Sequence, residues 1–193
     1  MKLRTKNTTT DPGTKPVSAA TLKLRLLKKL KCTLKYEKLA WDSGAKLVAG
    51  VDEVGRGSLF GPVVAAAVIL DPSYRIRGLR DSKLLDRETR EKLAPRIREH
   101  ALAWAIAAVD VATIDQINIY WASKRAMEVA VGKLTLPPDH LLIDAMRINF
   151  DCAQTPIIHG DALSASIAAA SIIAKVERDA MITAWDQIGR AHV

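Results

Sequence analysis

The segment Val48–Leu70, VAGVDEVGRGSLFGPVVAAAVIL, places the strongest constraint on how this chain folds. It contains two short apolar runs separated by a glycine-rich turn, a pattern typical of two strands joined as a hairpin. The adjacent acids Asp52 and Glu53 end the first run, and the turn that contains Arg56 follows at once. Carboxylates beside an open backbone and a cation indicate a metal-dependent site for a phosphate backbone.

The positive charge of the chain is concentrated in its N-terminal part. The 193 residues carry a formal net charge of +8, and residues 1–46 carry twelve Lys/Arg against three Asp/Glu, a net of +9. Residues 47–193 therefore carry a net charge of −1, which is +8 less +9. A basic arm of this kind binds polyanions such as nucleic acid or serves only as a solubilising tail, and charge alone does not choose between them.

The two cysteines, Cys32 and Cys152, match neither a metal-ligand spacing nor a disulfide framework, so a reducing cytoplasm suits the chain. No apolar run is long enough to span a membrane, and lysines interrupt the apolar residues near the N-terminus, so no secretory signal is evident. We expect a cytoplasmic monomer without a membrane partner.

Periodicity and turn signals predict an α/β fold with a mixed sheet. A disordered basic arm is expected at residues 1–18, and leucines at four-residue spacing from Leu22 to Leu34 predict a basic amphipathic helix within residues 19–45. The leucine face of this helix is expected to pack on the body, with contact to nucleic acid as an alternative. The folded domain is expected to cover residues 46–187.

The domain is predicted to contain five strands, and the first two form a hairpin across the glycine-rich turn. The predicted strands are 47–51, 63–70, 102–109, 141–143 and 156–158. The alanines of 102–109 leave a helix there as an alternative. The predicted helices are 87–100, 115–131 and 162–186. The first has Asp86 as its N-cap and Pro95 as a weak point. The second has Ile119, Ala122, Ala126 and Val129 on one face.

Three acids, Asp52, Asp144 and Asp161, each follow a predicted strand, and strand ends are where ligands bind in an open α/β sheet. Carboxylates gathered there repel one another unless a divalent cation neutralises them, and hard oxygen ligands suit Mg²⁺ or Mn²⁺. Two such ions can activate a water for phosphodiester cleavage. Glu53 shares the site only if the backbone turns between it and Asp52 or just after them, because neighbours on a strand face opposite ways.

Each candidate also has a structural interpretation. Asp144 and Asp161 are suitable caps for a turn or helix, and the turn around Arg56 is also a plausible tight hairpin with a solvated arginine. Ser82 and Lys83 offer a hydroxyl and a cation to a phosphate, or form an ordinary surface loop. Ser164 is a candidate phosphate contact, and it lies on an Ala/Ser helix face that is expected to pack on the sheet. His159 is a candidate proton shuttle or ligand, or else a structural histidine.

Together these motifs resemble the bacterial ribonuclease HII family over about residues 47–185. The matching pieces, in chain order, are AGVDEVGRG, GPVVAAAVIL, DSKLL, INI, LLIDA and HGDALSASIAAASIIAKVERD. The resemblance implies a ribonuclease H-like mixed five-stranded sheet flanked by helices. It also implies an endonuclease that uses Mn²⁺ or Mg²⁺ to cut the RNA strand of RNA–DNA hybrids, and single ribonucleotides in duplex DNA, leaving 5′-phosphate and 3′-hydroxyl ends.

The resemblance also implies roles for individual residues. The acids implied to be catalytic and to hold the metal ions are Asp52, Glu53, Asp144 and Asp161. The residues expected to bind nucleic acid are Gly55, Arg56, Gly57, Ser82, Lys83 and Ser164. The glycine-arginine-glycine turn is implied to sense the ribose 2′-hydroxyl, which is the group that distinguishes RNA from DNA.

The sequence departs from the family pattern at Ser58, Leu84, His159 and Glu177, none of which is an implied metal ligand. The family continues beyond the last helix with a tyrosine- and glycine-rich segment that contributes to the ribonucleotide junction. Residues 188–193, IGRAHV, match one reading frame of a sequencing adapter, ATCGGAAGAGCACACGTC, so we expect a non-native tail on a truncated gene. A catalytically impaired fragment and a non-catalytic nucleic-acid-binding protein are the alternative interpretations.

Overall fold

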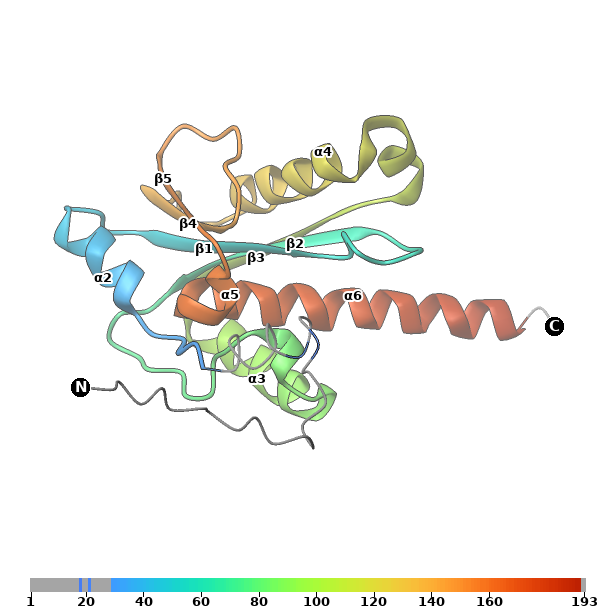
Figure 1. The fold of residues 1–193 in the computed structure, drawn as a ribbon, viewed down its shortest axis with the longest axis horizontal. Helices are drawn as coiled ribbons and strands as arrows, with labels where there is room; N and C mark the ends of the chain where they lie inside the picture. Colours follow the sequence, from blue (N-terminus) through green and yellow to red (C-terminus); the bar gives the residue numbers. More distant parts are fainter. Residues whose placement is uncertain (1–17, 19–20, 22–28, 192–193) are drawn as a thin grey trace, which may run out of the picture.

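The structure is a computed structural model, and it describes residues 18, 21 and 29–191. The predicted disordered arm, apart from Ser18, and the first half of the predicted leucine pattern, Leu22 and Leu26, therefore lie outside the described residues, as do residues 192–193. A five-stranded mixed sheet forms the middle layer, with helix α4 on one face and helices α3 and α6 on the other (Figure 1). The predicted architecture, a mixed five-stranded sheet flanked by helices, is confirmed.

The sheet has the strand order β3-β2-β1-β4-β5. The strands are β1 (Val48–Val54), β2 (Val63–Leu70), β3 (Ala101–Val109), β4 (His140–Asp144) and β5 (Ala153–Ile157). The first three strands are antiparallel, and the predicted hairpin of β1 with β2 is confirmed, while β4 and β5 run parallel to β1. Strand β5 begins three residues before its predicted start, and the helix alternative for β3 is wrong.

The helices cover both faces of the sheet. They are α2 (Lys35–Asp42), the short 3₁₀ helix η1 (Ser82–Leu84), α3 (Arg87–His100), α4 (Val111–Gly132), α5 (Gly160–Leu163) and α6 (Ala165–Ala191). The predicted N-cap of α3 is confirmed, because the Asp86 carboxylate accepts a 2.7 Å hydrogen bond from the Thr89 N–H. The helix predicted over 162–186 is instead two helices, since Ser164 between them has an extended backbone (φ −104°, ψ 131°).

In its described part, the helix predicted within residues 19–45 is not continuous. Of residues 29–47, only α2 is helical, and Leu30 and Leu34 precede it. Thr33 forms an isolated parallel β-bridge with Ser164, and its N–H donates to the Leu163 carbonyl at 3.0 Å. These contacts with a distant part of the chain hold the segment extended, so the local periodicity is overridden by tertiary pairing.

Helix α4 bends at Asn118, whose φ of 65° lies in the left-handed region. The Asn118 Oδ1 accepts hydrogen bonds from the N–H groups of Tyr120 (3.0 Å) and Trp121 (3.3 Å). This side chain therefore caps the longer second part of the helix. The bend sets the orientation of the two aromatic residues that follow it.

The apolar core lies on both faces of the sheet. On the α4 face the predicted burial of Ala122 and Ala126 is confirmed, but Val129 is exposed and Met127 is buried beside them. On the α6 face, a Cβ added at Gly50 would lie 2.1 Å from the backbone of α6, so the predicted close packing of helix on sheet is confirmed. No helix in the described part of the chain combines the length and the apolar character needed to cross a membrane.

Candidate metal centre

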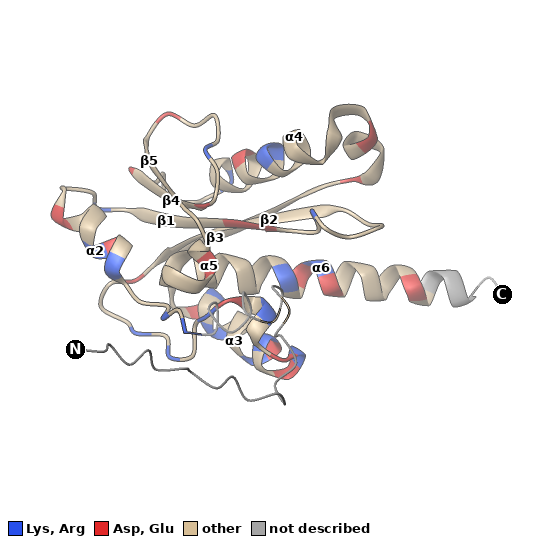
Figure 2. Ribbon diagram, viewed as in Figure 1, with Lys and Arg blue, Asp and Glu red and all other residues tan. Residues whose placement is uncertain are grey.

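Four carboxylates from three elements converge at one end of the central strands. Asp52 and Glu53 lie near the end of β1, Asp144 ends the neighbouring parallel strand β4, and Asp161 lies in α5 after β5. Asp52 and Asp161 are each only 4% exposed. Acidic segments appear at β1 and at α5 near the middle of the molecule in Figure 2. The convergence of strand ends predicted from the sequence therefore occurs.

Burial and the charges of neighbouring acids change the protonation of Asp52, Glu53 and Asp144. Burial, followed by the charges of Glu53, Asp144 and Asp161, raises the pKa of Asp52 well above its ordinary value. Burial and the charge of Asp144 raise the pKa of Glu53 to about 7. Burial and the charge of Asp161 also raise the pKa of Asp144. A divalent cation among these side chains would offset both causes of the shifts, the burial of the carboxylates and their mutual repulsion.

Strand β1 does not turn between Asp52 and Glu53. It stays paired with β2 as far as Val54, and the backbone turns only at Gly55, where φ is +109°. Both acids nevertheless interact with Asp144, because β4 ends beside them. The sequence condition for a shared site, a turn just after the pair, is met one residue beyond Val54.

The turn between β5 and α5 connects Asp144 with Asp161. His159 has a left-handed backbone (φ 59°) and occupies the N-cap position of α5, so Asp161 is not the N-cap. The Gly160 N–H donates to Asp144 Oδ1 at 2.7 Å, so Asp144 also has the turn-capping role considered from the sequence. A Cβ on Gly160 would lie 3.3 Å from the same oxygen and 2.6 Å from Ile167, so glycine is required for this close approach.

The loop at η1 lies against the same acids. Lys83 Nζ is 3.3 Å from Asp161 Oδ2, and the Lys83 side chain is 78% exposed. Asp81 accepts a 2.8 Å hydrogen bond from the Lys83 N–H, which shapes the loop. Ser82 is buried, and its hydroxyl lies 2.9 Å from that of Ser171 on α6. Of the two candidate contacts in this loop, only the Lys83 side chain is open to a ligand.

The donor set consists of carboxylate oxygens, which suits a hard divalent cation such as Mg²⁺ or Mn²⁺. Several of these oxygens already have protein partners, since Asp52 Oδ1 accepts from the Glu53 N–H at 2.8 Å and Asp161 pairs with Lys83. Among the described residues, no group of three or more His, Cys, Asp or Glu side chains is placed so that it could hold a metal ion. The four acids are therefore candidate ligands by the chemistry of their oxygens and by their mutual electrostatics alone.

The glycine-rich turn lies directly beside these acids. Arg56 Nη1 is 3.9 Å from Glu53 Oε1, and the Arg56 side chain is 44% exposed. A Cβ added at Gly57 would meet no atom within 4 Å, so this backbone is open. A Cβ at Gly55 would lie 2.6 Å from the Pro62 carbonyl oxygen. The turn therefore presents an open backbone and a cation next to the carboxylates.

Arg178 on α6 holds this turn in place, and the sequence analysis did not identify it. Its Nε donates to the Pro62 carbonyl at 2.9 Å and its Nη2 donates to the Phe60 carbonyl at 2.8 Å. Only 7% of the residue is exposed. An arginine on a helix that packs closely on a sheet was the available signal, because a buried guanidinium needs several acceptors.

Tyr120 and Trp121 form an aromatic surface next to Arg56, which the sequence analysis also missed. The Arg56 guanidinium carbon lies 5.7 Å from the centre of the Tyr120 ring, and Lys124 Nζ lies 5.2 Å from that of Trp121. The two residues are 42% and 54% exposed. Neighbouring aromatic residues followed by two basic ones were the signal in the sequence.

Ser164 does not reach the surface. It is fully buried, and its hydroxyl donates to Glu37 Oε1 at 2.6 Å. Its expected contact with a phosphate is therefore wrong for this structure. The residue lies at the break between α5 and α6, where its side chain binds Glu37 of α2.

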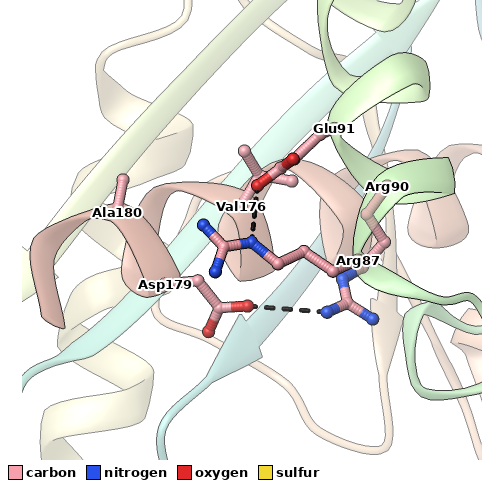
Figure 3. Close-up of a pocket in the computed structure, with 6 residues that line it drawn as sticks. All are labelled: Arg87, Arg90, Glu91, Val176, Asp179 and Ala180. Atoms are coloured by element: carbon pink, nitrogen blue, oxygen red, sulfur yellow. Dashed lines mark hydrogen bonds and ion pairs between the residues drawn. The ribbon is translucent and has the colours of Figure 1, made fainter. Parts of the chain in front are cut away.

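A small pocket between α3 and α6 is separate from this group of acids. Its volume is about 70 Å³, and its charged side chains pair with one another (Figure 3). Arg87 Nε is 2.7 Å from Glu91 Oε1, and Arg90 Nη2 is 3.6 Å from Asp179 Oδ2. The first pair lies within α3, and the second joins α3 to α6, so the pocket has a structural role.

Comparison with known proteins agrees with the geometry. The sequence model of the family described as ribonuclease HII matches residues 49–191. A ribonuclease HII from Koribacter versatilis is 77% identical over 174 residues, which are 90% of this chain and 68% of the relative. The match to the family includes 188–191, part of the segment that the sequence analysis set apart. Its adapter origin stays a prediction.

Solved structures share the fold. The ribonuclease H2 from Pyrococcus horikoshii superposes with a TM-score of 0.66 at 28% identity, over 74% of this chain and 76% of that one. The Bst ribonuclease HIII in complex with Mn²⁺ gives a TM-score of 0.59 at 25% identity, over 79% of this chain and 57% of that one. The family match covers most of the chain, including all four converging acids. The chain therefore belongs to the ribonuclease HII family and is a ribonuclease.

Proposed function

We propose that the chain acts as a cytoplasmic, monomeric endonuclease on RNA–DNA hybrids and on duplex DNA with embedded ribonucleotides. It cleaves the phosphodiester on the RNA side and leaves 5′-phosphate and 3′-hydroxyl ends. The observation that carries the proposal is the convergence of Asp52, Glu53, Asp144 and Asp161 beside the open backbone of the Gly55–Gly57 turn.

The same four acids are the proposed ligands of Mn²⁺ or Mg²⁺. The raised pKa values of Asp52, Glu53 and Asp144 reflect burial and repulsion by neighbouring acids, which favours uptake of positive charge. A divalent cation bound there would activate water and stabilise the leaving oxygen of the phosphodiester. The Mn²⁺ complex of the structurally similar Bst ribonuclease HIII supports this choice of metal.

The glycine turn is the proposed ribose sensor. The open space at Gly57 allows a sugar to approach the backbone, and Arg56 can donate to a phosphate or hydroxyl. Lys83, exposed beside Asp161, is the proposed contact for a neighbouring phosphate. Because Arg178 fixes the carbonyl groups of the same loop, it keeps the sensor at a constant position relative to the acids.

The aromatic surface extends this interface along the duplex. Arg56 lies near both Glu53 and the Tyr120 ring, and Lys124 lies over the rings of Tyr120 and Trp121. Aromatic faces pack against sugars and bases, and the lysine attracts the phosphates between them. These contacts support a nucleic acid duplex as the ligand.

The decisive experiment uses a labelled DNA duplex with one ribonucleotide, an all-DNA duplex of the same sequence, and an RNA–DNA hybrid. We expect cleavage of the first and third only, dependent on Mn²⁺ or Mg²⁺ and abolished by EDTA. Metal-independent cleavage, or equal cleavage of the all-DNA duplex, would contradict the proposal.

Deletion of the basic arm distinguishes the proposed nuclease from a non-catalytic nucleic-acid-binding protein. Residues 1–28 can be deleted without touching Thr33 or Glu37, which contact the catalytic domain. The proposed nuclease keeps cleavage after this deletion, although its affinity for nucleic acid at low salt falls. A chain that binds the duplexes but never cuts them, and loses binding with the arm, would instead be the binding protein.

A further inference from the structure

A fully buried carboxylate, Glu37 on α2, contacts the break between α5 and α6. Its Oε1 accepts a hydrogen bond from the Ser164 hydroxyl at 2.6 Å and another from the Ser166 N–H at 2.8 Å. Glu37 is 0% exposed and lies 127 residues from Ser164 along the chain. The region of the family match begins at residue 49, so this contact comes from outside it.

The extended segment just before α2 reinforces the same contact. The Thr33 N–H donates to the Leu163 carbonyl at 3.0 Å, and the Thr33 carbonyl accepts from the Ala165 N–H at 3.0 Å. The segment Thr33–Glu37 is thus hydrogen-bonded to consecutive residues 163–166 through both backbone and side chain. We refer to Thr33–Glu37 as the N-terminal strap.

The break held by the strap carries Asp161. Helix α5 has only four residues, and one helical turn does not hold its shape alone in water. Ser164, which ends it, has an extended backbone, and its N–H donates to the Gly160 carbonyl at 2.8 Å. The position of Asp161 therefore depends on what fixes residues 163–166. The strap is hydrogen-bonded there, and Gly50 of β1 packs against the backbone of Ser166.

We propose that Glu37 is a positioning residue of the metal centre, which acts by fixing the α5–α6 break and with it the carboxylate of Asp161. This rests on the proposed function, in which Asp161 is a metal ligand. Groups behind a metal ligand orient it, and changing them commonly lowers metal affinity by about 10- to 100-fold. The strap thus makes a segment outside the matched region part of the catalytic architecture.

The arrangement of Glu37 fits a geometric role better than a purely stabilising one. Among the described residues, its second oxygen, Oε2, is buried without a hydrogen-bond partner. A half-satisfied buried carboxylate is costly, and an apolar side chain of similar size would avoid that cost. What the carboxylate supplies is one oxygen that receives two donors from the break, and so sets their spacing.

The test is Mn²⁺ binding to the full chain, measured by isothermal titration calorimetry at pH 8 without nucleic acid. We expect Glu37→Leu to bind Mn²⁺ about tenfold more weakly. Glu37→Gln, which keeps an accepting oxygen, should stay within about threefold of the wild type. Ser164→Ala, a milder change that keeps the fold if Glu37→Leu does not, should weaken binding about fivefold through loss of one hydrogen bond.

Two controls separate positioning from general stability. Met127→Ala creates a cavity on the opposite face of the sheet and should leave Mn²⁺ affinity unchanged. Hydrogen exchange of the peptide covering residues 160–168 should accelerate in Glu37→Leu or Ser164→Ala, and not in Met127→Ala. Equal losses of Mn²⁺ affinity in Met127→Ala and Glu37→Leu would overturn the proposal. So would Mn²⁺ affinity and hydrogen exchange that stay unchanged in both Glu37→Leu and Ser164→Ala.

Asp161→Asn distinguishes this proposal from the proposed function. If Asp161→Asn binds Mn²⁺ as the wild type does, the ligand assignment fails, and the exchange experiment alone then decides whether the strap fixes the break. If Asp161→Asn weakens Mn²⁺ binding, and Glu37→Leu and Ser164→Ala do not, the metal centre stands and the positioning role of Glu37 is wrong.

Discussion

The middle and the end of the same strands differ in what their side chains do. In the middle of β1, Ala49 and Val51 are fully buried among apolar neighbours and stabilise the fold. The next two residues, Asp52 and Glu53, are held near other acids, and burial and mutual charge raise their pKa values. One strand thus combines a region that favours folding with a region that opposes it.

Function in this molecule lies at the ends of the strands. Apolar burial in the middle of the sheet provides the free energy that allows carboxylates to be gathered at its end. Changes in the middle should alter stability without a specific effect on chemistry, while changes at the end should alter chemistry and even stabilise the metal-free fold. The predictions below separate these two behaviours.

The largest expected effect is at Asp144. We expect Asp144→Asn to lower the cleavage rate by at least about 100-fold. Removing a group that only orients a metal ligand lowers activity by about 10- to 100-fold, and Asp144 is itself a proposed ligand. Binding of the ribonucleotide-containing duplex should persist within about threefold, since the phosphate contacts remain. The rate and the duplex affinity are measured on the same preparation.

Asp139 provides a matched control for Asp144. Its carboxylate accepts hydrogen bonds from the N–H groups of Lys46 (2.8 Å) and Leu47 (3.1 Å), before β1 begins. Asp139→Asn should therefore leave the cleavage rate within about twofold, since its caps are structural. An equal loss of activity in both variants would remove the distinction between the strand end and its surroundings.

In the middle of the sheet we expect the opposite behaviour. Met127→Ala removes a fully buried side chain of α4 and should lower the free energy of unfolding by about 2–5 kcal/mol. The rate constant of cleavage by the folded protein should change little at temperatures well below unfolding. Urea denaturation and single-turnover cleavage measure the two quantities, and a large loss of rate with unchanged stability would contradict the account.

The carboxylate end should make the metal-free protein less stable as pH rises. Because the folded-state pKa of Glu53 is about 7, against an ordinary value of 4.5, the folded protein binds more protons than the unfolded chain between these pH values. Stability therefore falls from about pH 4.5 to about pH 7, with Glu53 contributing about 3 kcal/mol at most. Asp52 and Asp144 act in the same direction.

Urea midpoints in EDTA at pH 5, 6, 7 and 8 measure this dependence. Glu53→Gln isolates its source, because the difference in stability between variant and wild type should grow in favour of the variant as pH rises. Added Mn²⁺ should restore stability of the wild type at pH 8. A parallel pH dependence in the two proteins would mean that Glu53 lies in an ordinary aqueous environment.

The smallest expected effect is on the aromatic surface. Tyr120→Ala should weaken duplex binding about 5- to 10-fold, and Lys124→Ala should lower the slope of log affinity against log salt by about 1. Tyr74 is the control, because it is equally exposed at 41% but stacks on His100. Equal effects of Tyr74→Ala and Tyr120→Ala on duplex affinity would show that the surface is not an interface.

Local patterns were enough to predict the hairpin, its strands and the acids at their ends. The apolar runs of β1 and β2 and the capping of α3 by Asp86 depend on neighbours in sequence, so periodicity and turn chemistry identify them. The acids could be predicted to meet because parallel strands end at the same edge.

Contacts between distant residues could not be predicted. The segment around Thr33 is extended because it pairs with Ser164, and the helix is broken at Ser164 because that residue bonds to Glu37. Arg178 holds carbonyl groups 116 and 118 residues away. Such pairings form only in the assembled fold, and no local sequence pattern indicates them.

The central claim is that the acids at the strand end form one divalent-cation site, and Mn²⁺ titration by calorimetry tests it most directly. At pH 8, the wild type should bind Mn²⁺, and Asp52→Asn and Asp144→Asn should each weaken binding by at least about tenfold. Asp139→Asn should match the wild type. Binding that is equally strong in all four proteins would contradict the account, because the cation would then be held elsewhere.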